Sequence, residues 1–226
     1  MNRPYTFINV AMTADGKIDT FERKGAAISS KQDKQRVDEL RAAADAVLVG
    51  GRTLLEEQPK LTVKSGALRE MRIGQGRSPN PIKVGAVTVA DIPKDSDFIK
   101  AGDARLVIFT TSQTSRLQLE NLRALGVEVF VDDAPRVNLN NMMLTLKKIG
   151  VDHLMVEGGG TQVLAGNGRV RGPGHNAILK RQDGTYMLVH HFYDAEARGI
   201  ATLQIRPLTW EEQGWPVAGE AIEAPR

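Results

Sequence analysis

The stretch VEGGGTQVLAGNGRVRGPGH, from Val156 to His175, decides how this sequence divides into folding units. It starts as the end of an apolar strand followed by a glycine-rich turn. Such a turn exposes backbone N–H groups to a phosphate, because no Cβ stands in the way. A helix normally follows and favours the anion with its N-terminus. Here QVLA leads directly to residues that are unfavourable inside a helix: Gly166, Gly168, Gly172, Pro173 and Gly174. The stretch therefore predicts a change of architecture at Thr161.

Short β-rich runs alternate with helical patterns before Gly150, which is typical of an α/β fold around a largely parallel sheet. The expected strands cover residues 6–12, 46–50, 82–89, 104–112, 127–131 and 153–157. The expected helices cover residues 30–44, 115–126 and 139–150. Ser29 or Ser30 can cap the first helix, and a glycine suited to a left-handed cap ends each of the others. The polar segment 64–81 is interrupted by Gly66, Gly74 and Gly76, so it predicts a surface excursion.

The chain after Thr161 has the pattern of antiparallel β structure. Short β-rich runs at residues 177–181, 186–195 and 201–210 are joined by Asp-Gly and glycine-rich turns. Both tryptophans and three of the four histidines also lie in this part, which marks a shift in composition. The sequence therefore predicts two domains, residues 1–161 and residues 162–226.

The composition limits the classes of partner. The formal charge of +3 is small for 226 residues, and basic and acidic residues are interspersed, so we expect neither a nucleic-acid nor a membrane partner. The absence of cysteine excludes disulfides, thiolate catalysis and thiolate metal sites. The first residues, MNRPYTFINVAMTADG, do not have the form of a signal peptide, so a cytoplasmic protein is expected.

Three expected strand ends carry groups that suit phosphates. GGRT at 50–53 offers a guanidinium and a hydroxyl, TTSQT at 110–114 offers clustered hydroxyls, and VEGGGT at 156–161 offers free backbone N–H groups. In a parallel sheet these carboxyl ends meet at one edge, where ligands bind. The three together predict a ligand with separated phosphates, such as a dinucleotide that carries an extra 2′-phosphate.

The order of these motifs resembles the dihydrofolate-reductase-like superfamily. NVAMTADGKI, RVDELRAAADAVLVGGRTLLEEQPKLTV and LMVEGGGT are similar to the pyrimidine reductase of riboflavin biosynthesis, which occurs alone or as half of a bifunctional deaminase-reductase. The resemblance covers about residues 3–161. It implies a mostly parallel sheet with flanking helices, here incomplete at its C-terminal end, and reduction of a phosphoribosylamino pyrimidine to its ribitylamino form by NADPH. The resemblance also suggests a homodimer, but the missing closing strands can form part of that contact, so the oligomeric state stays open.

The resemblance assigns roles to individual residues. The cofactor would contact Gly50, Arg52, Thr53, Thr110, Thr111 and Ser112 on its 2′-phosphate side, and Gly158, Gly159, Gly160 and Thr161 at its pyrophosphate. Asn9 and Ser29 would bind the substrate, and Glu157 and Asp15 would face it as the catalytic pair. On local sequence alone, Asp15 also suits an ordinary turn, Ser29 a helix cap, Asn9 a strand end and Arg52 a surface charge. Gln58 stands where the family usually has Asp, and an amide carries no charge.

The last part resembles the C-terminal end of a family 43 arabinanase, a five-bladed propeller, over about residues 158–219. RGPGHN, YMLVHHFYDA and LTWEEQGWPV carry this resemblance, which implies an antiparallel segment like one propeller blade. Both families have a Gly-Gly-Gly-Thr string, so a fusion with its crossover within 158–161 is expected. In arabinanases the equivalent of His175 lies near a metal ion, but a lone histidine in a glycine-rich loop predicts no metal site.

A glycoside hydrolase needs two carboxylates across the scissile bond, and in arabinanases these come from earlier blades that this sequence lacks. Asp183, Asp194 and Glu196 are therefore expected to be turn and surface charges. His190 and His191 are adjacent in a strand, so they should face opposite ways. The sequence predicts a reductase that the fusion has impaired or left intact. An inactive chimera and an arabinan-degrading fragment are the alternatives.

Overall fold

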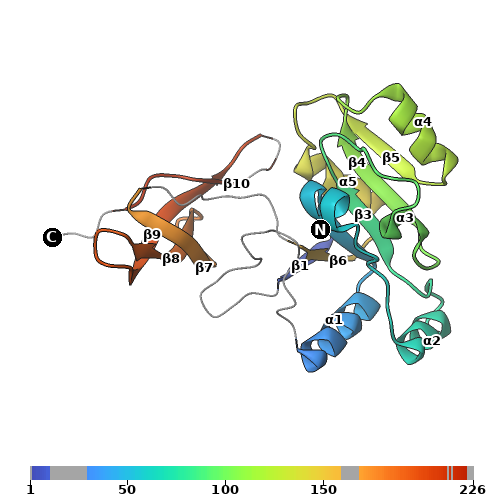
Figure 1. The fold of residues 1–226 in the computed structure, drawn as a ribbon, viewed down its shortest axis with the longest axis horizontal. Coiled ribbons are helices and arrows are strands. Elements are labelled where there is room, and N and C mark those ends of the chain that lie inside the picture. The colour runs from blue at the N-terminus through green and yellow to red at the C-terminus, as the bar shows by residue number, and fades with distance from the viewer. Residues whose placement is uncertain (1, 11–29, 159–167, 213, 215, 223–226) are drawn as a thin grey trace. The chain divides into compact units, whose positions relative to one another are not determined.

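The computed structural model describes residues 2–10, 30–158, 168–212, 214 and 216–222 (Figure 1). The chain separates into two compact units, and each unit holds one sheet. The first sheet has six strands in the order β1-β6-β2-β3-β4-β5, and the second has four in the order β10-β9-β8-β7. None of the described helices is both long and apolar enough to cross a membrane.

All neighbouring strands of the six-stranded sheet are parallel. In chain order the strands are β1 (Tyr5–Asn9), β2 (Ala46–Gly50), β3 (Ile82–Ala86), β4 (Leu106–Thr111), β5 (Glu128–Asp132) and β6 (His153–Glu157). Their carboxyl ends therefore lie along one edge of the sheet. The prediction of a parallel α/β sheet is confirmed: β2 and β6 have the expected bounds, and the other four expected strands are present with shifted ends.

Helices cover both faces of this sheet. They are α1 (Lys31–Ala43), α2 (Gly66–Gly74), α3 (Asp97–Lys100), α4 (Arg116–Ala124) and α5 (Leu139–Lys148), with a π-helical turn, η1, at Thr53–Glu57. Val37, Leu54, Phe98 and Leu122, from α1, η1, α3 and α4, belong to the core on one face. On the other face, α5 contributes Met142 and Leu146 to a second core. The sheet is thus the middle layer of a three-layer α/β unit.

The helix ends follow the sequence closely. Ser30, rather than Ser29, caps α1, because its side chain accepts a hydrogen bond from the backbone N–H of Asp33 at 3.1 Å. After α4 and α5 the backbone turns at Gly126 and Gly150, whose φ angles are 78° and 97°. In each turn the two backbone N–H groups after the helix bond back to its last carbonyls, which is the Schellman arrangement. The predicted glycine caps are confirmed.

The segment 64–81 is mostly exposed and stays within the first unit, as expected of a surface excursion, but it also contains a helix, α2, that was not predicted. Gly66 begins the helix and Gly74 ends it, while Gly76 lies beyond it with φ of 72°. None of the three glycines therefore interrupts a helix interior. Arg72 on α2 is buried, and its guanidinium donates to the backbone carbonyls of Ala42, Ala44 and Ser78. Burial, with the neighbouring charge of Arg77, lowers the pKa of Arg72 to about 10.

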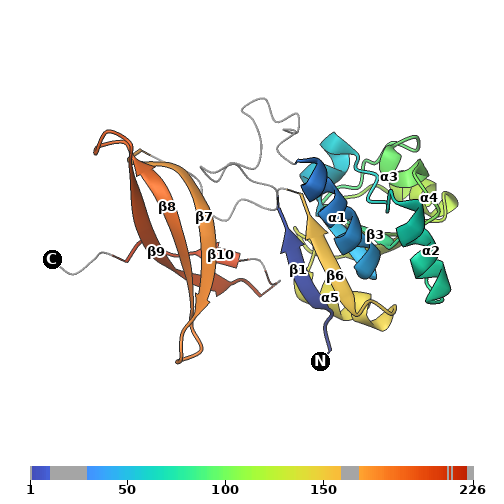
Figure 2. The same cartoon turned by 90° about the horizontal axis from the view of Figure 1, so that it is seen from below.

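The second unit is an antiparallel sheet of β7 (Val170–Lys180), β8 (Tyr186–Asp194), β9 (Ile200–Trp210) and β10 (Pro216–Ala218) (Figure 2). The three expected strands are present. β7 starts earlier than expected and takes in the glycines at 172 and 174, where its pairing with β8 shifts register. His190 is buried and His191 is half-buried, in agreement with their predicted opposite orientation.

Asp194 corrects one expectation, because it is a turn residue but not a surface charge. Its side chain is only 2 % exposed. The carboxylate accepts hydrogen bonds from the backbone N–H groups of Glu196 and Ala197, and Arg169 pairs with it at 2.6 Å. The hydrogen bond from Arg169 outweighs desolvation and holds the pKa of Asp194 below its ordinary value. Asp183 lies in a turn as expected, where it accepts from the backbone N–H and the hydroxyl of Thr185.

Candidate functional site

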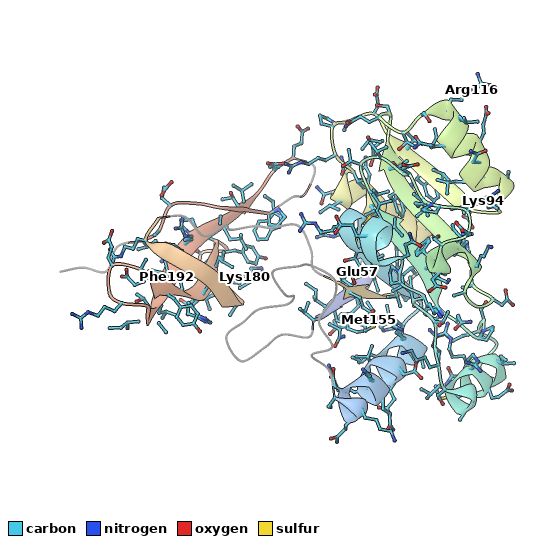
Figure 3. The ribbon with its side chains drawn as sticks, in the orientation of Figure 1. Glu57, Lys94, Arg116, Met155, Lys180 and Phe192 are labelled. Atoms are coloured by element: carbon cyan, nitrogen blue, oxygen red, sulfur yellow. The ribbon has the colours of Figure 1, made fainter. Side chains whose placement is uncertain are left out.

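The candidate site lies at the carboxyl ends of β1, β6 and β2. In the parallel register, Glu157 of β6 lies beside Asn9 of β1 on one side and Val49 of β2 on the other. Met155, labelled in Figure 3, precedes Glu157 by two residues and lies in the same core as α1. Side chains two residues apart in a strand point to the same face, so Glu157 points to the side of the sheet that α1 covers.

Glu157 forms a bidentate ion pair with Arg41 of α1. Nε and Nη2 of Arg41 donate to the two carboxylate oxygens at 2.7 and 2.6 Å. The side chains of Arg41 and Glu157 are only 15 and 12 % exposed. Burial opposes the charge on Arg41, but the hydrogen bond and charge of Glu157, with the charge of Asp38, outweigh it and raise the pKa of Arg41. The pair is therefore an ionised, nearly dry feature at the strand ends.

Asn9 is held by a second arginine of the same helix. Nη2 of Arg36 donates to the side-chain oxygen of Asn9 at 2.8 Å, and Nε of Arg36 donates to Asp33 at 3.2 Å. Neither arginine was among the predicted site residues, because the apolar spacing that predicts α1 does not single them out. The available signal was at Arg41, which stands between Leu40 and Ala42 on the core side of the helix, where a solvated charge is not expected.

Gly158 and Thr53 come together where β6 and β2 end. Gly158 has φ of 85°, and a Cβ placed there would lie 2.6 Å from Oγ1 of Thr53. A Cβ at Gly50 would meet nothing within 4 Å. Arg52 is exposed and makes no hydrogen bond or ion pair to any residue that the structure describes. The β2 end thus leaves open space beside Gly50, near the cationic side chain of Arg52, whereas the side chain of Thr53 fills the space beside Gly158.

The hydroxyls at the end of β4 are used within the protein. Thr110 and Thr111 are fully buried, and both donate to the backbone carbonyl of Thr88, at 3.1 and 2.8 Å. Thr111 also accepts from the backbone N–H of Gln113. Ser112 is exposed, but its hydroxyl donates to Asp133 at 3.1 Å. The structure therefore does not support direct phosphate contacts from Thr110 and Thr111, and β3 separates them from the β2 end.

Comparison with known proteins places this arrangement in a family. Residues 4–165, well over half of the chain, match the RibD C-terminal domain. The chain belongs to this family. The predicted resemblance to a pyrimidine reductase is thereby confirmed.

Two relatives of this RibD C-terminal domain are named 2,5-diamino-6-ribosylamino-4(3H)-pyrimidinone 5′-phosphate reductase. The protein of Archaeoglobus fulgidus is 38 % identical over 161 residues, which cover 71 % of this chain and 73 % of the relative. The protein of Methanothermobacter thermautotrophicus is 35 % identical over 159 residues, which cover 70 % of this chain and 69 % of that relative. The matched region covers only 40 % of the RibD protein of Aquifex aeolicus, at 29 % identity. The family is one of reductases, which implies a nicotinamide cofactor.

Solved structures of two kinds are similar to parts of this chain. The deaminase-reductase of Thermotoga maritima matches with a TM-score of 0.52 at 25 % identity and covers 70 % of this chain and 39 % of that chain. A mutant of Cellvibrio cellulosa alpha-L-arabinanase is 39 % identical over 27 % of this chain and 19 % of that chain, with a TM-score of 0.26.

The remaining predicted site residues of this RibD C-terminal domain are not all described. Asp15, Ser29, Gly159, Gly160 and Thr161 lie outside the described residues, as does the side chain of His175. Gln58 follows η1 with φ of 47° and is half-buried. Among the described residues, no group of three or more His, Asp or Glu side chains is placed to hold a metal ion.

Gly158→Ala is expected to lower the free energy of unfolding by about 1–2 kcal/mol, because an L-residue at positive φ brings its Cβ against the backbone. The close approach to Thr53 adds to this. Urea unfolding followed by circular dichroism measures the change. Gly50→Ala is the matched control, since its Cβ would enter open space and should change stability by at most about 0.5 kcal/mol. Equal effects of the two substitutions would contradict the strained, close approach at Gly158.

Proposed function

We propose that this chain uses NADPH to reduce the ribosyl group of a phosphoribosylamino pyrimidine in riboflavin biosynthesis. The observation that carries the proposal is the ionised Glu157–Arg41 pair beside Asn9, at the strand ends of a RibD C-terminal domain. The substrate class follows from the names of the two reductases to which the chain is 38 and 35 % identical. The homodimer and the cytoplasmic location that the sequence suggests stay predictions.

The end of β6 fits the phosphates of a dinucleotide. Because Gly158 lacks a Cβ, the side chain of Thr53 packs directly against the backbone at the end of β6, so a phosphate there would meet backbone N–H groups and a hydroxyl together. Arg52 at the end of β2 is exposed, and its guanidinium has no partner among the described residues. A guanidinium binds a phosphate in bidentate fashion, so Arg52 suits the 2′-phosphate that distinguishes NADPH from NADH. Gly158, Thr53 and Arg52 would therefore hold the cofactor.

The chain itself positions the substrate. The reduction adds two hydrogens to the sugar, and the nicotinamide supplies the hydride. Both oxygens of Glu157 accept hydrogen bonds from Arg41, which fixes the plane of the carboxylate. A carboxylate held in this way retains lone pairs for substrate hydroxyls, so we assign Glu157 an orienting role. Asn9, fixed by Arg36, presents its amide N–H₂ beside it. Asp15 stays the second catalytic candidate that the resemblance assigns from the sequence.

Calorimetric titration of the chain with NADPH and with NADH tests the cofactor site. Arg52→Ala should weaken NADPH binding about 10- to 100-fold, because a hydrogen bond to a charged group contributes about 1.5–3 kcal/mol. Binding of NADH should change little, since it lacks the 2′-phosphate. Arg116→Ala is the matched control. Arg116 of α4 is a highly exposed arginine that follows β4, and β3 separates β4 from β2, which ends shortly before Arg52 (Figure 3). Turnover is measured with the pyrimidine 5′-phosphate named for the relatives.

Two results would contradict the proposal. A folded sample that binds neither dinucleotide would mean that the chain is a reductase by ancestry only, which is the inactive chimera. If Arg52→Ala and Arg116→Ala weaken NADPH binding equally, Arg52 is not part of the cofactor site.

A further inference from the structure

The C-terminus of α1 has backbone carbonyls that the helix itself cannot satisfy. The chain passes from α1 into β2 with only Ala44 and Asp45 between them, so there is no glycine turn to fold back on the carbonyls. Ala42 and Ala44 are fully buried, out of reach of water. A buried carbonyl without a partner loses its hydrogen bond to water and gains nothing in return, which is unfavourable. These carbonyls therefore need donors from elsewhere in the chain.

Two arginines from the segment 62–78 supply these donors. Nη1 of Arg72 donates to the carbonyls of Ala42 and Ala44 at 2.7 and 2.8 Å. Nη2 of Arg77 donates to the carbonyl of Ala44 at 2.6 Å and to the carboxylate of Asp45 at 2.8 Å. The positive charges also face the negative end of the helix dipole.

The same segment forms hydrogen bonds with α1 at two further points. Asp38 of α1 accepts hydrogen bonds from the backbone N–H groups of Lys64 and Ser65 at 2.6 and 2.8 Å, directly before α2 begins. Arg41 donates from Nη1 to the carbonyl of Thr62 at 3.1 Å. Each helix thus caps the other: Asp38 of α1 holds the start of α2, and Arg72 of α2 holds the end of α1. Such reciprocal contacts fix both the rotation of α1 and its position along its axis.

We propose that Arg72 is a positioning residue that holds α1 in the register at which Arg41 meets Glu157. Arg41 lies one residue before the first carbonyl that Arg72 binds, so a shift of this helix end moves the guanidinium of Arg41 directly. Arg72 contacts neither Glu157 nor the strand ends in the structure, and it acts only through α1. Its kinetic consequence rests on the proposed function, whereas its effect on the Arg41–Glu157 pair does not.

Arg72 is better suited to this role than Arg77. Arg72 is 2 % exposed, and its three hydrogen bonds all go to backbone carbonyls, from Nε and Nη1 of one rigid fork. Arg77 also donates to the carbonyls of Ala42 and Ala43, but at 3.4 and 3.2 Å, and it is partly exposed and shares its guanidinium with Asp45, so water can replace part of what it does. A lysine at position 72 has one nitrogen and cannot reproduce the planar fork.

Arg72→Lys tests the proposal through the Nε–H proton of Arg41. NMR follows the exchange of this proton with water, and Arg41→Lys assigns its signal. The exchange should become about 10-fold faster in Arg72→Lys, because losing one charge-assisted hydrogen bond costs about 1.4 kcal/mol or more. In turnover, the KM for the pyrimidine should rise about 10-fold while the affinity for NADPH stays unchanged. A residue that only stabilised the fold would change neither in the folded protein.

Arg105→Lys is the matched control. Arg105 also donates to a carbonyl at a helix end, that of Ile149 after α5, and pairs with Glu128, but it does not contact α1. Unchanged exchange in folded Arg72→Lys, or equal acceleration in Arg105→Lys, would overturn the proposal. If Arg72→Lys does not fold, Arg77→Lys decides, because Arg77 donates to the same carbonyls of Ala42 and Ala44; faster exchange is expected, and unchanged exchange overturns the proposal. If the wild type shows no reductase activity, the proposed function fails while the exchange still decides the role of Arg72.

Discussion

Arg41→Met is expected to lower the free energy of unfolding by about 3 kcal/mol, because it leaves the carboxylate of Glu157 buried without a partner. Glu157 is 12 % exposed, so water can compensate only a small part of the loss. The substitution also frees the carbonyl of Thr62, which accepts from Nη1 of Arg41. Urea unfolding followed by circular dichroism, extrapolated linearly to water, measures the difference.

The double variant Arg41→Met, Glu157→Met separates stability from function. An apolar pair of similar volume is often as stable as a buried ion pair, so the double variant should recover most of the lost stability, to within about 1 kcal/mol of the wild type. Its reductase activity should stay lost if Glu157 orients the substrate. Arg116→Met serves as a control for an exposed pair, since Arg116 and Glu120 form a surface pair expected to contribute at most about 0.5 kcal/mol. If Arg41→Met lowers the free energy of unfolding no more than Arg116→Met does, the buried Arg41–Glu157 pair does not stabilise the fold.

The features that the sequence predicts well are those that depend on local periodicity. Buried strands such as AVLVG at β2 and HLMVE at β6 are short apolar runs bounded by turns, and a parallel sheet follows from their alternation with helices. Gly126 and Gly150 mark helix ends because only a residue without a Cβ adopts their φ without strain. Glycines were less informative at α2. Gly66 and Gly74 suggested an interrupted segment, but they stand at the two ends of this helix.

The site was harder to predict because its residues meet through tertiary contacts. Glu157 and Asn9 could be identified as strand-end polar groups, but Arg41 lies 116 positions from Glu157 in the sequence, and nothing local connects them. Thr110 and Thr111 show the opposite case. Their clustered hydroxyls suggested a ligand, whereas the carbonyl of Thr88, 22 and 23 positions earlier, accepts from both. Side-chain type indicates hydrogen-bonding capacity, and only the fold determines whether that capacity is already used.

Lys83 is the least expected residue of the core, since lysine is almost never fully buried. It lies on β3 with no exposed surface, and its Nζ donates to the carbonyls of Phe98 and Ala101, at 2.8 and 2.5 Å, so it caps the end of α3. Burial, only partly offset by the charge of Asp97, lowers the pKa of Lys83 from 10.5 to about 8. The sequence placed Lys83 in a strand but gave no reason to place its amine in the core.

The stability of this chain is therefore expected to rise between about pH 8 and pH 10.5, relative to a Lys83→Met variant. In this window the unfolded chain keeps the proton on Lys83 while the folded chain has released it. The unfolded state then binds more protons, so raising the pH favours the folded state. The shift from 10.5 to about 8 corresponds to about 3 kcal/mol, at 1.36 kcal/mol per pKa unit. Urea unfolding of both proteins at several pH values gives the difference curve.

The comparison with Lys83→Met removes the contributions that other groups make in the same window, because Arg72 and the exposed lysines titrate alike in both proteins. A constant offset between the curves is expected from the carbonyls of Phe98 and Ala101, which lose their donor, and it does not affect the slope. Lys34→Met is the control, since Lys34 is an exposed lysine on α1 and its removal should leave the wild-type slope intact. Parallel curves for the wild type and Lys83→Met would mean that Lys83 stays protonated in the folded core throughout, and that its two carbonyl acceptors outweigh its desolvation.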